Sequence, residues 1–187
     1  KDGATTLGSG TLANVGGIAT ATFTTSSLSA GSHPITAIYG GGANFLTSTS
    51  APLAQTVSYV FSGFQTPLTT AGTLQSPTTS GTWSFSRVVP IKWRLTNGNG
   101  ANITDLSSAN PLSATFAGAT CPGAPTTTTV LLYSPTAGAA GGSTFRSGST
   151  GFIFNWDATK NATKGCWWIR LKLSDGSPEK VTTVLLQ

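Results

Sequence analysis

Charge is scarce in this sequence. Only 8% of its 187 residues are charged, it contains a single histidine, and it has no methionine. Charged residues normally make up about a quarter of a globular domain, so few side chains remain for acid–base chemistry or metal binding. No run of about 18 apolar residues occurs, so no membrane-spanning helix is predicted. We therefore expect no catalytic residues, no cofactor, no metal and no membrane insertion.

Cysteine is almost as rare, with two residues, Cys121 and Cys166. Two cysteines and the distant His33 do not supply a zinc site, and there is no Cys-x-x-Cys redox pair. The pair therefore predicts one disulfide in a protein of an oxidising, extracellular compartment.

Serine, threonine, glycine and alanine dominate, yet 38% of the residues are hydrophobic and nine are phenylalanine, which is enough for a folded core. Short alternating stretches recur between glycine- and proline-rich turns, and no helical period of useful length is present. This pattern predicts an all-β chain of two tandem β-sandwich domains, residues 1–58 and residues 59–187. Strands are expected at Ser9–Asn14, Gly17–Phe23, Ser32–Tyr39, Pro52–Val57, Thr82–Arg87, Val88–Leu95, Leu112–Ala117, Thr126–Ser134, Ser143–Arg146, Gly151–Trp156, Cys166–Leu173 and Lys180–Leu186, with a loop over Gln65–Gly81.

The most hydrophobic strand candidate runs from Gly165 to Leu173, and we expect it at the centre of the second sandwich. Alternation places Trp167, Ile169, Leu171 and Leu173 on one face and Trp168, Arg170 and Lys172 on the other. The second face is a candidate interaction surface, because an exposed Trp168 would stack on a sugar ring or meet another subunit. We favour the other interpretation, in which Trp168 is buried by the other sheet or by the junction between the domains, because large aromatic residues in strands mostly belong to the core.

The net charge of +5 belongs to the second part, since residues 1–58 carry only Lys1 and Asp2. Lys92 and Arg94 alternate with apolar residues, as Arg170 and Lys172 do, so we interpret them as solvated strand faces rather than a nucleic-acid site. Among the acids, Asp157 follows an aromatic strand and could serve as a general acid, but a turn-capping role is the simpler interpretation.

Residues 1–58 resemble the bacterial Ig-like repeat of large surface proteins. The matching pieces are Lys1-Asp2-Gly3, Leu28-Ser29-Ala30-Gly31-Ser32-His33, Ile35-Thr36-Ala37-Ile38-Tyr39 and Ala43-Asn44-Phe45. In such repeats Lys-Asp-Gly stands mid-domain, so the resemblance implies that about two N-terminal strands are missing here. They would come from a neighbouring chain, as in donor-strand complementation, or from upstream sequence of a processed or partial chain.

Residues 59–187 resemble the PxKF domain, a β-sandwich module of bacterial secreted proteins. The naming motif reads Pro90-Ile91-Lys92-Trp93, with tryptophan in place of the usual phenylalanine. This resemblance implies a fold and an extracellular location, and it implies no catalytic function.

Together these features predict a non-catalytic, extracellular structural or adhesive protein, a subunit or segment of a bacterial surface polymer, stalk or filament. It would assemble through sandwich edges, with its apolar closing strand Val181–Leu186 contributing, and its partners would be other copies or neighbouring domains of a larger surface protein. The alternative is a carbohydrate-binding accessory module of a secreted enzyme, which would take a glycan on an open platform of Trp168, Trp93 or Trp83.

Overall fold

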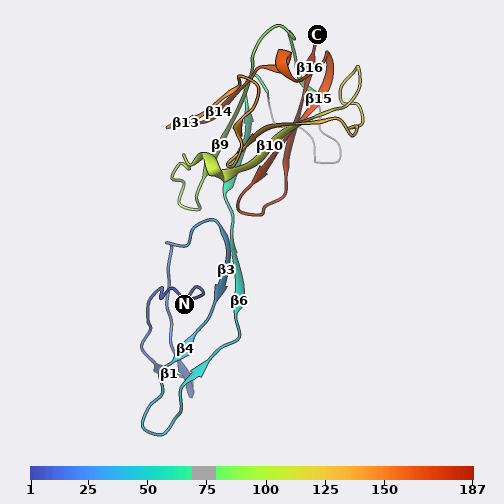
Figure 1. The fold of residues 1–187 in the computed structure, drawn as a ribbon. Helices are drawn as coiled ribbons and strands as arrows, with labels where there is room; N and C mark the ends of the chain where they lie inside the picture. Colours follow the sequence, from blue (N-terminus) through green and yellow to red (C-terminus); the bar gives the residue numbers. More distant parts are fainter. Residues whose placement is uncertain (69–78) are drawn as a thin grey trace. The chain divides into compact units, whose positions relative to one another are not determined.

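The computed structural model describes residues 1–68 and 79–187, with the backbone alone for residues 79–81. Within these residues the chain consists of short strands and two single turns of 3-10 helix (Figure 1). It divides into two units, Lys1–Val57 and Ser58–Gln187. The predicted all-β fold class is therefore confirmed.

The first unit contains only very short ladders. Its strands are β1 (Ala13–Val15), β2 (Ile18–Thr20), β3 (Gly31–Ile35), β4 (Ile38–Tyr39), β5 (Ser48–Thr49) and β6 (Leu53–Val57). They form three two-stranded antiparallel sheets, β1-β2, β3-β6 and β4-β5. The β1–β2 turn is Gly16-Gly17, and both residues have the positive φ that a tight primed turn requires, 61° and 87°. The structure describes this whole unit, and each of its strands pairs with only one other strand. Each strand therefore has one edge without a ladder partner.

The strand predicted at Ser32–Tyr39 is in fact two strands, β3 and β4, which belong to different sheets. Between them the amide of Thr36 donates to the carbonyl of Lys1 at 2.9 Å, while the carbonyl of Ala37 accepts from Ser50 at 2.9 Å. The chain thus changes partner at this point, which alternation alone does not reveal because both halves keep the same period.

The second unit is a two-layer β-sandwich. Its elements are β7 (Val60–Gln65), β8 (Thr79–Trp83), β9 (Val89–Thr96), η1 (Leu106–Ser108), β10 (Ala109–Phe116), β11 (Thr129–Ser134), β12 (Gly138–Ala139), β13 (Thr144–Gly148), β14 (Gly151–Trp156), η2 (Ala158–Lys160), β15 (Gly165–Leu173) and β16 (Lys180–Leu186). Among the described residues one sheet has the order β12-β11-β10-β15-β16-β8, and the other has the order β13-β14-β9-β7.

The core lies between these two sheets. Trp167, Ile169 and Leu171 of β15 are fully buried there, as the alternation in this strand predicted. The two sheets meet through aromatic pairs, with ring centroids 5.8 Å apart for Trp156 and Trp167. The sandwich therefore forms where the apolar face predicted for Gly165–Leu173 packs against the buried aromatic side chains of the other sheet.

The closing strand β16 is an interior part of this sandwich. It pairs antiparallel with β15 and parallel with β8, and Val181, Val184 and Leu186 on it are buried. The hypothesis that Val181–Leu186 supports assembly with other copies is therefore corrected, because both of its edges are already paired within the unit.

Strand β8 begins and ends earlier than the predicted strand Thr82–Arg87. The ladder ends at Trp83, and Ser84–Arg87 form a turn in which the amide of Arg87 donates to the carbonyl of Ser84 at 3.0 Å. Residues 69–78 of the loop predicted over Gln65–Gly81 lie outside the described residues, whereas Gln65 ends β7 and residues 79–81 belong to β8.

Candidate functional site

Trp168, the aromatic member of the predicted interaction surface, is buried. It lies on the outer face of the six-stranded sheet, yet it is only 7% exposed, and its indole Nε1 donates to the carbonyl oxygen of Gly123 at 3.1 Å. Ala117, Cys166 and Val181 form a small apolar cluster with it. Its cover is the loop that contains Gly123, rather than the opposite sheet. The ring is thus buried, as in the interpretation that we favoured, but a loop and not the other sheet covers it, and Trp168 offers no stacking surface.

A disulfide between Cys121 and Cys166 holds that loop against the sheet. The two Cα atoms are 5.1 Å apart, and Cys166 is fully buried on β15. The loop is also bonded through its backbone, since the amide of Ala117 donates to Cys166 O at 2.8 Å and the amide of Cys166 donates to Gly118 O at 2.7 Å. The disulfide therefore fixes the loop that covers Trp168.

The two cations of the same predicted surface, Arg170 and Lys172, differ in burial and in pairing. Arg170 is half-buried, and its Nε and Nη2 atoms donate to one carboxylate oxygen of Glu179 at 2.9 and 2.7 Å. Its charge is therefore already paired. Lys172 is exposed. Trp168, Arg170 and Lys172 share a strand face as predicted, but they do not form a joint binding surface.

The motif Pro90-Ile91-Lys92-Trp93 forms the first half of β9 and has one buried and one outer face. Ile91 and Trp93 are fully buried, whereas Pro90 and Lys92 are partly exposed. The Trp93 ring stacks against both Phe145 and Phe152, with centroid distances of 5.5 and 5.3 Å. The tryptophan of this motif is therefore a core residue.

The predicted aromatic platform for a glycan does not exist at two of its three positions, because Trp93 and Trp168 are buried. Trp83 is partly exposed, but it packs against the core and its Nε1 donates to the carbonyl of Val88 at 3.0 Å. One partly exposed indole does not make the open platform that stacking on a sugar chain needs.

Each of the five carboxylates accepts a hydrogen bond from a neighbouring group. The pairs are Asp2 with His33, Asp105 with Ser107, Asp157 with Thr159, Asp175 with the amides of Tyr59 and Ser177, and Glu179 with Arg170. These contacts give every acid a structural role. Asp157, considered above as a general acid, stands at the start of η2 and binds the hydroxyl of Thr159 at 2.6 Å.

Two negative findings apply to residues 1–68 and 79–187. These residues contain no group of three or more histidine, cysteine or acidic side chains that could hold a metal ion. They also contain no helix that is long and apolar enough to cross a membrane.

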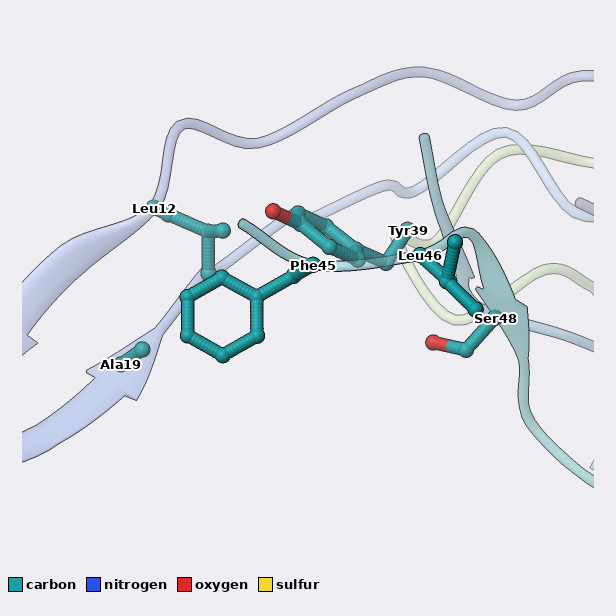
Figure 2. Close-up of a pocket in the computed structure, with 6 residues that line it drawn as sticks. All are labelled: Leu12, Ala19, Tyr39, Phe45, Leu46 and Ser48. Carbon is teal, nitrogen blue, oxygen red and sulfur yellow. The ribbon is translucent and has the colours of Figure 1, made fainter. Parts of the chain in front are cut away.

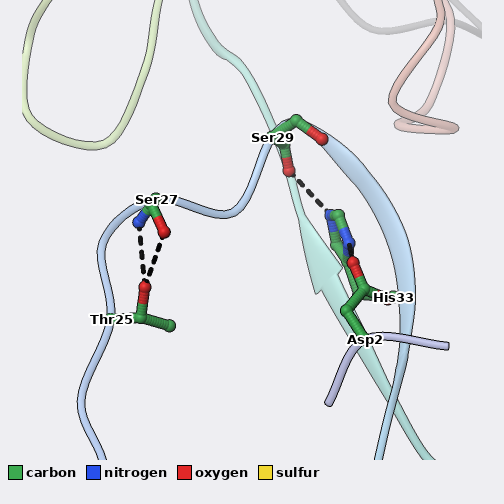
Figure 3. Close-up of polar contacts among 5 residues, drawn as sticks. All are labelled: Asp2, Thr25, Ser27, Ser29 and His33. Carbon is green, nitrogen blue, oxygen red and sulfur yellow. Dashed lines mark hydrogen bonds and ion pairs between the residues drawn. The ribbon is translucent and has the colours of Figure 1, made fainter. Parts of the chain in front are cut away.

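His33 is the one buried residue of Lys1–Val57, a unit that the structure describes throughout. Its Nδ1 lies 2.7 Å from Asp2 Oδ2, and its Nε2 lies 2.8 Å from the carbonyl oxygen of Ser29 (Figure 3). Both partners are acceptors, so the doubly protonated ring suits this site best. The hydrogen bond to Asp2 above all, and then that to Ser29, raises the pKa of His33 above its ordinary value of 6.5, while partial burial opposes this.

This contact predicts a pH-dependent anchor for the N-terminal segment. Because the folded pKa is the higher one, its stabilising effect is fully present below about pH 6.5 and is lost as the pH rises through the folded pKa. NMR titration of this ring, the single histidine of the chain, should give a raised pKa that falls towards 6.5 in Asp2→Asn. Asp105→Asn, in the other unit, is the control and should leave it unchanged. An equal pKa in the wild type and in Asp2→Asn would contradict the prediction.

The first unit leaves large apolar side chains in solvent. Eight of them are between 47% and 91% exposed: Leu12, Val15, Ile18, Phe23, Ile38, Phe45, Leu46 and Leu53. Several of these lie around a pocket of about 480 Å³ between the β1–β2 and β4–β5 hairpins, where the rings of Phe45 and Tyr39 and the side chain of Leu12 come together (Figure 2). We refer to the pocket, lined by Leu12, Ala19, Tyr39, Phe45, Leu46 and Ser48, as the apolar pocket.

Burying one such side chain contributes about 1.5–3 kcal/mol, so eight exposed ones represent a large stabilisation that this unit does not obtain by itself. Sequence reasoning did not single out Leu12, Phe45 and Leu46 as surface residues. No local signal could have found them, because an apolar residue in a short strand is normally a core residue.

Residues 1–58 match the family model of the bacterial Ig-like domain, group 3. No curated protein and no solved structure matches the chain. A bacterial Ig-like domain suggests at most a non-catalytic surface or adhesive module. Such domains are generally non-enzymatic and commonly extracellular, and the disulfide is consistent with that location. The resemblance of residues 59–187 to the PxKF domain stays a prediction.

Proposed function

We propose that this chain is a structural or adhesive module of a bacterial surface assembly, in which another copy of the chain adds an extended strand to the first unit. The observation that carries the proposal is the exposed apolar surface of Lys1–Val57, with His33 as its one buried residue. A surface of this kind on a separate unit marks an interaction site.

A strand is the shape that suits this site. The β1–β2 and β4–β5 hairpins each have unpaired backbone edges, and these edges can hydrogen-bond an added strand. Alternate side chains of that strand would enter the apolar pocket beside Leu12 and Phe45. Apart from Asp2 and His33, which pair with each other, Lys1 is the only residue of this unit with a charged side chain, so an uncharged, apolar strand fits it best.

The second unit would act as the rigid part of the module, and we propose that it is a PxKF-type domain. Its closed core and its disulfide support a mechanical role. The engagement of every carboxylate in a structural contact supports a role without catalysis.

The proposal is tested by placing lysines in the apolar pocket, in the double variant Leu12→Lys with Phe45→Lys. Both side chains are exposed, so the separate chain should fold as before. Loss of two buried apolar contacts should raise the dissociation constant of self-association at least about 100-fold. Light scattering against concentration measures this, and electron microscopy shows whether the associated form is a regular filament.

The matched control is Thr6→Lys with Ser26→Lys, two exposed polar positions of the same unit. It adds the same charge and should leave association unchanged. Two results would contradict the proposal: a wild-type chain that stays monomeric at all concentrations, or equal weakening by both double variants.

A further inference from the structure

The outer face of the four-stranded sheet gathers three cations that are far apart in the sequence. Lys92 and Arg94 point outwards from β9, and Arg146 points outwards from β13, at the edge of the sheet. The register places Ile153 of β14 beside both Lys92 and Arg146, so these three residues form one row across the sheet. We refer to Lys92, Arg94 and Arg146 as the basic face; β13, β14 and β9 lie side by side in Figure 1.

The spacing of these charges follows from strand geometry. Two strand separations place Lys92 and Arg146 about 10 Å apart, and two residues along β9 place Lys92 and Arg94 about 7 Å apart. The three charges thus form a flat triangle rather than a single point, which suits a polymer with repeated negative groups better than a small anion.

No carboxylate neutralises this face within the part of the chain that the structure describes. The ion pairs found there are His33–Asp2 and Arg170–Glu179, and neither involves the basic face. Arg94 donates through Nε to the amide oxygen of Asn102 at 2.8 Å, which orients its guanidinium without removing its charge. By contrast, Arg170 on the other sheet is paired with Glu179.

Besides the apolar Ile153 and Pro90, the cations have polar neighbours, and none of these neighbours is aromatic. Thr144 and Asn155 lie beside this row, and Gln65 of β7 is opposite Lys92. The aromatic residues of β9 and β14, which are Trp93, Phe152, Phe154 and Trp156, are buried on the inner face. Nucleic-acid bases and neutral sugars are commonly held by stacking on exposed rings, and this face has none on those strands.

We propose that the basic face binds an acidic polysaccharide, a polymer of hydroxylated sugar rings with repeated carboxylates. Its carboxylates would pair with Lys92, Arg94 and Arg146, since guanidinium and ammonium groups form charge-assisted hydrogen bonds with them. Its hydroxyl groups would bond to the hydroxyl and amide side chains of Thr144, Asn155 and Gln65. This site is independent of strand addition to the first unit.

The test measures binding of the whole chain to polygalacturonate by isothermal titration calorimetry. Release of counterions from about three contacts predicts affinity about 20-fold weaker at 200 mM than at 50 mM salt. The triple variant Lys92→Gln, Arg94→Gln, Arg146→Gln should bind at least about 10-fold more weakly at low salt and lose most of the salt dependence. Its melting temperature should match that of the wild type, because the three side chains lie outside the core.

The matched control is Lys160→Gln, Lys164→Gln, Lys172→Gln, which removes the same charge from three exposed lysines elsewhere. It should change the affinity by less than about 3-fold, as distant charges are screened. Equal loss in both triple variants would overturn the proposal, because binding would then follow net charge alone. Tighter binding of single-stranded DNA than of polygalacturonate would overturn it in favour of a nucleic-acid partner, and absence of binding to polygalacturonate would overturn it outright.

Discussion

Replacing both Cys121 and Cys166 by serine is expected to lower the free energy of unfolding of the second unit by about 4 kcal/mol. The two residues are 45 positions apart, and opening a loop of that length returns much conformational entropy to the unfolded chain. An effect of that size is a large fraction of the stability of a small domain. Urea unfolding of the wild type and of the double variant measures it.

The same variant should also uncover Trp168, because the disulfide holds the loop that covers this ring. The fluorescence emission should therefore shift to longer wavelength before global unfolding. Trp168→Phe, made in both backgrounds, assigns the signal among the five tryptophans. An unchanged unfolding curve, or a spectrum that is the same with and without the disulfide, would contradict the role assigned to this loop.

Trp93→Ala is expected to cost about 3–5 kcal/mol of stability, comparable to the disulfide. The side chain is fully buried and stacks on both Phe145 and Phe152, so its removal leaves a cavity at the centre of the aromatic core. Thermal and urea unfolding report the change. A loss below about 1 kcal/mol would mean that the core collapses around the gap, and that the stacked rings do not depend on Trp93.

A matched pair of phenylalanine variants separates ring volume from hydrogen bonding. Trp93 Nε1 is buried and has no hydrogen-bond partner among the described residues, whereas Trp156 Nε1 donates to Asn161 Oδ1 at 2.9 Å. Trp93→Phe removes an unsatisfied donor and Trp156→Phe removes a satisfied one, so Trp93→Phe should cost about 1 kcal/mol less. Equal losses of stability in the two variants would show that the unpaired indole N–H of Trp93 does not destabilise the fold.

Strand β15 illustrates how much of the fold was predictable. Its period of two placed Trp167, Ile169 and Leu171 on the core face, and it did so without knowledge of any partner strand. The predicted bounds Gly151–Trp156 and Lys180–Leu186 also agree with β14 and β16. Long, strongly apolar strands are well predicted because their pattern depends on a single buried face.

The short strands were predicted less well. Ser32–Tyr39 was interpreted as one strand, but it divides between the β3–β6 and β4–β5 sheets. Strand β8 was placed too late at Thr82–Arg87, because its position depends on parallel pairing with the distant β16. In both cases a partner far away in the sequence decides where the ladder begins and ends.

The candidate site was the least predictable part. Alternation correctly placed Trp168, Arg170 and Lys172 on one face, but burial of Trp168 depends on a loop more than 40 residues away, at Gly123. The pairing of Arg170 with Glu179 likewise depends on the geometry of the turn between β15 and β16. A strand pattern tells which face a side chain occupies, but it does not tell what covers that face.

Local sequence was enough to determine that this chain is all-β, that β15 has one core face, and that Cys121 and Cys166 are the one candidate disulfide pair. Tertiary structure alone decided that Trp168 is covered, that the first unit leaves Phe45 in solvent, and that Lys92 and Arg146 share one face. The physical reason is that alternation and turn chemistry act over a few neighbouring residues. Burial and charge pairing instead depend on which distant strands become neighbours, and that is settled only when the sheets pack.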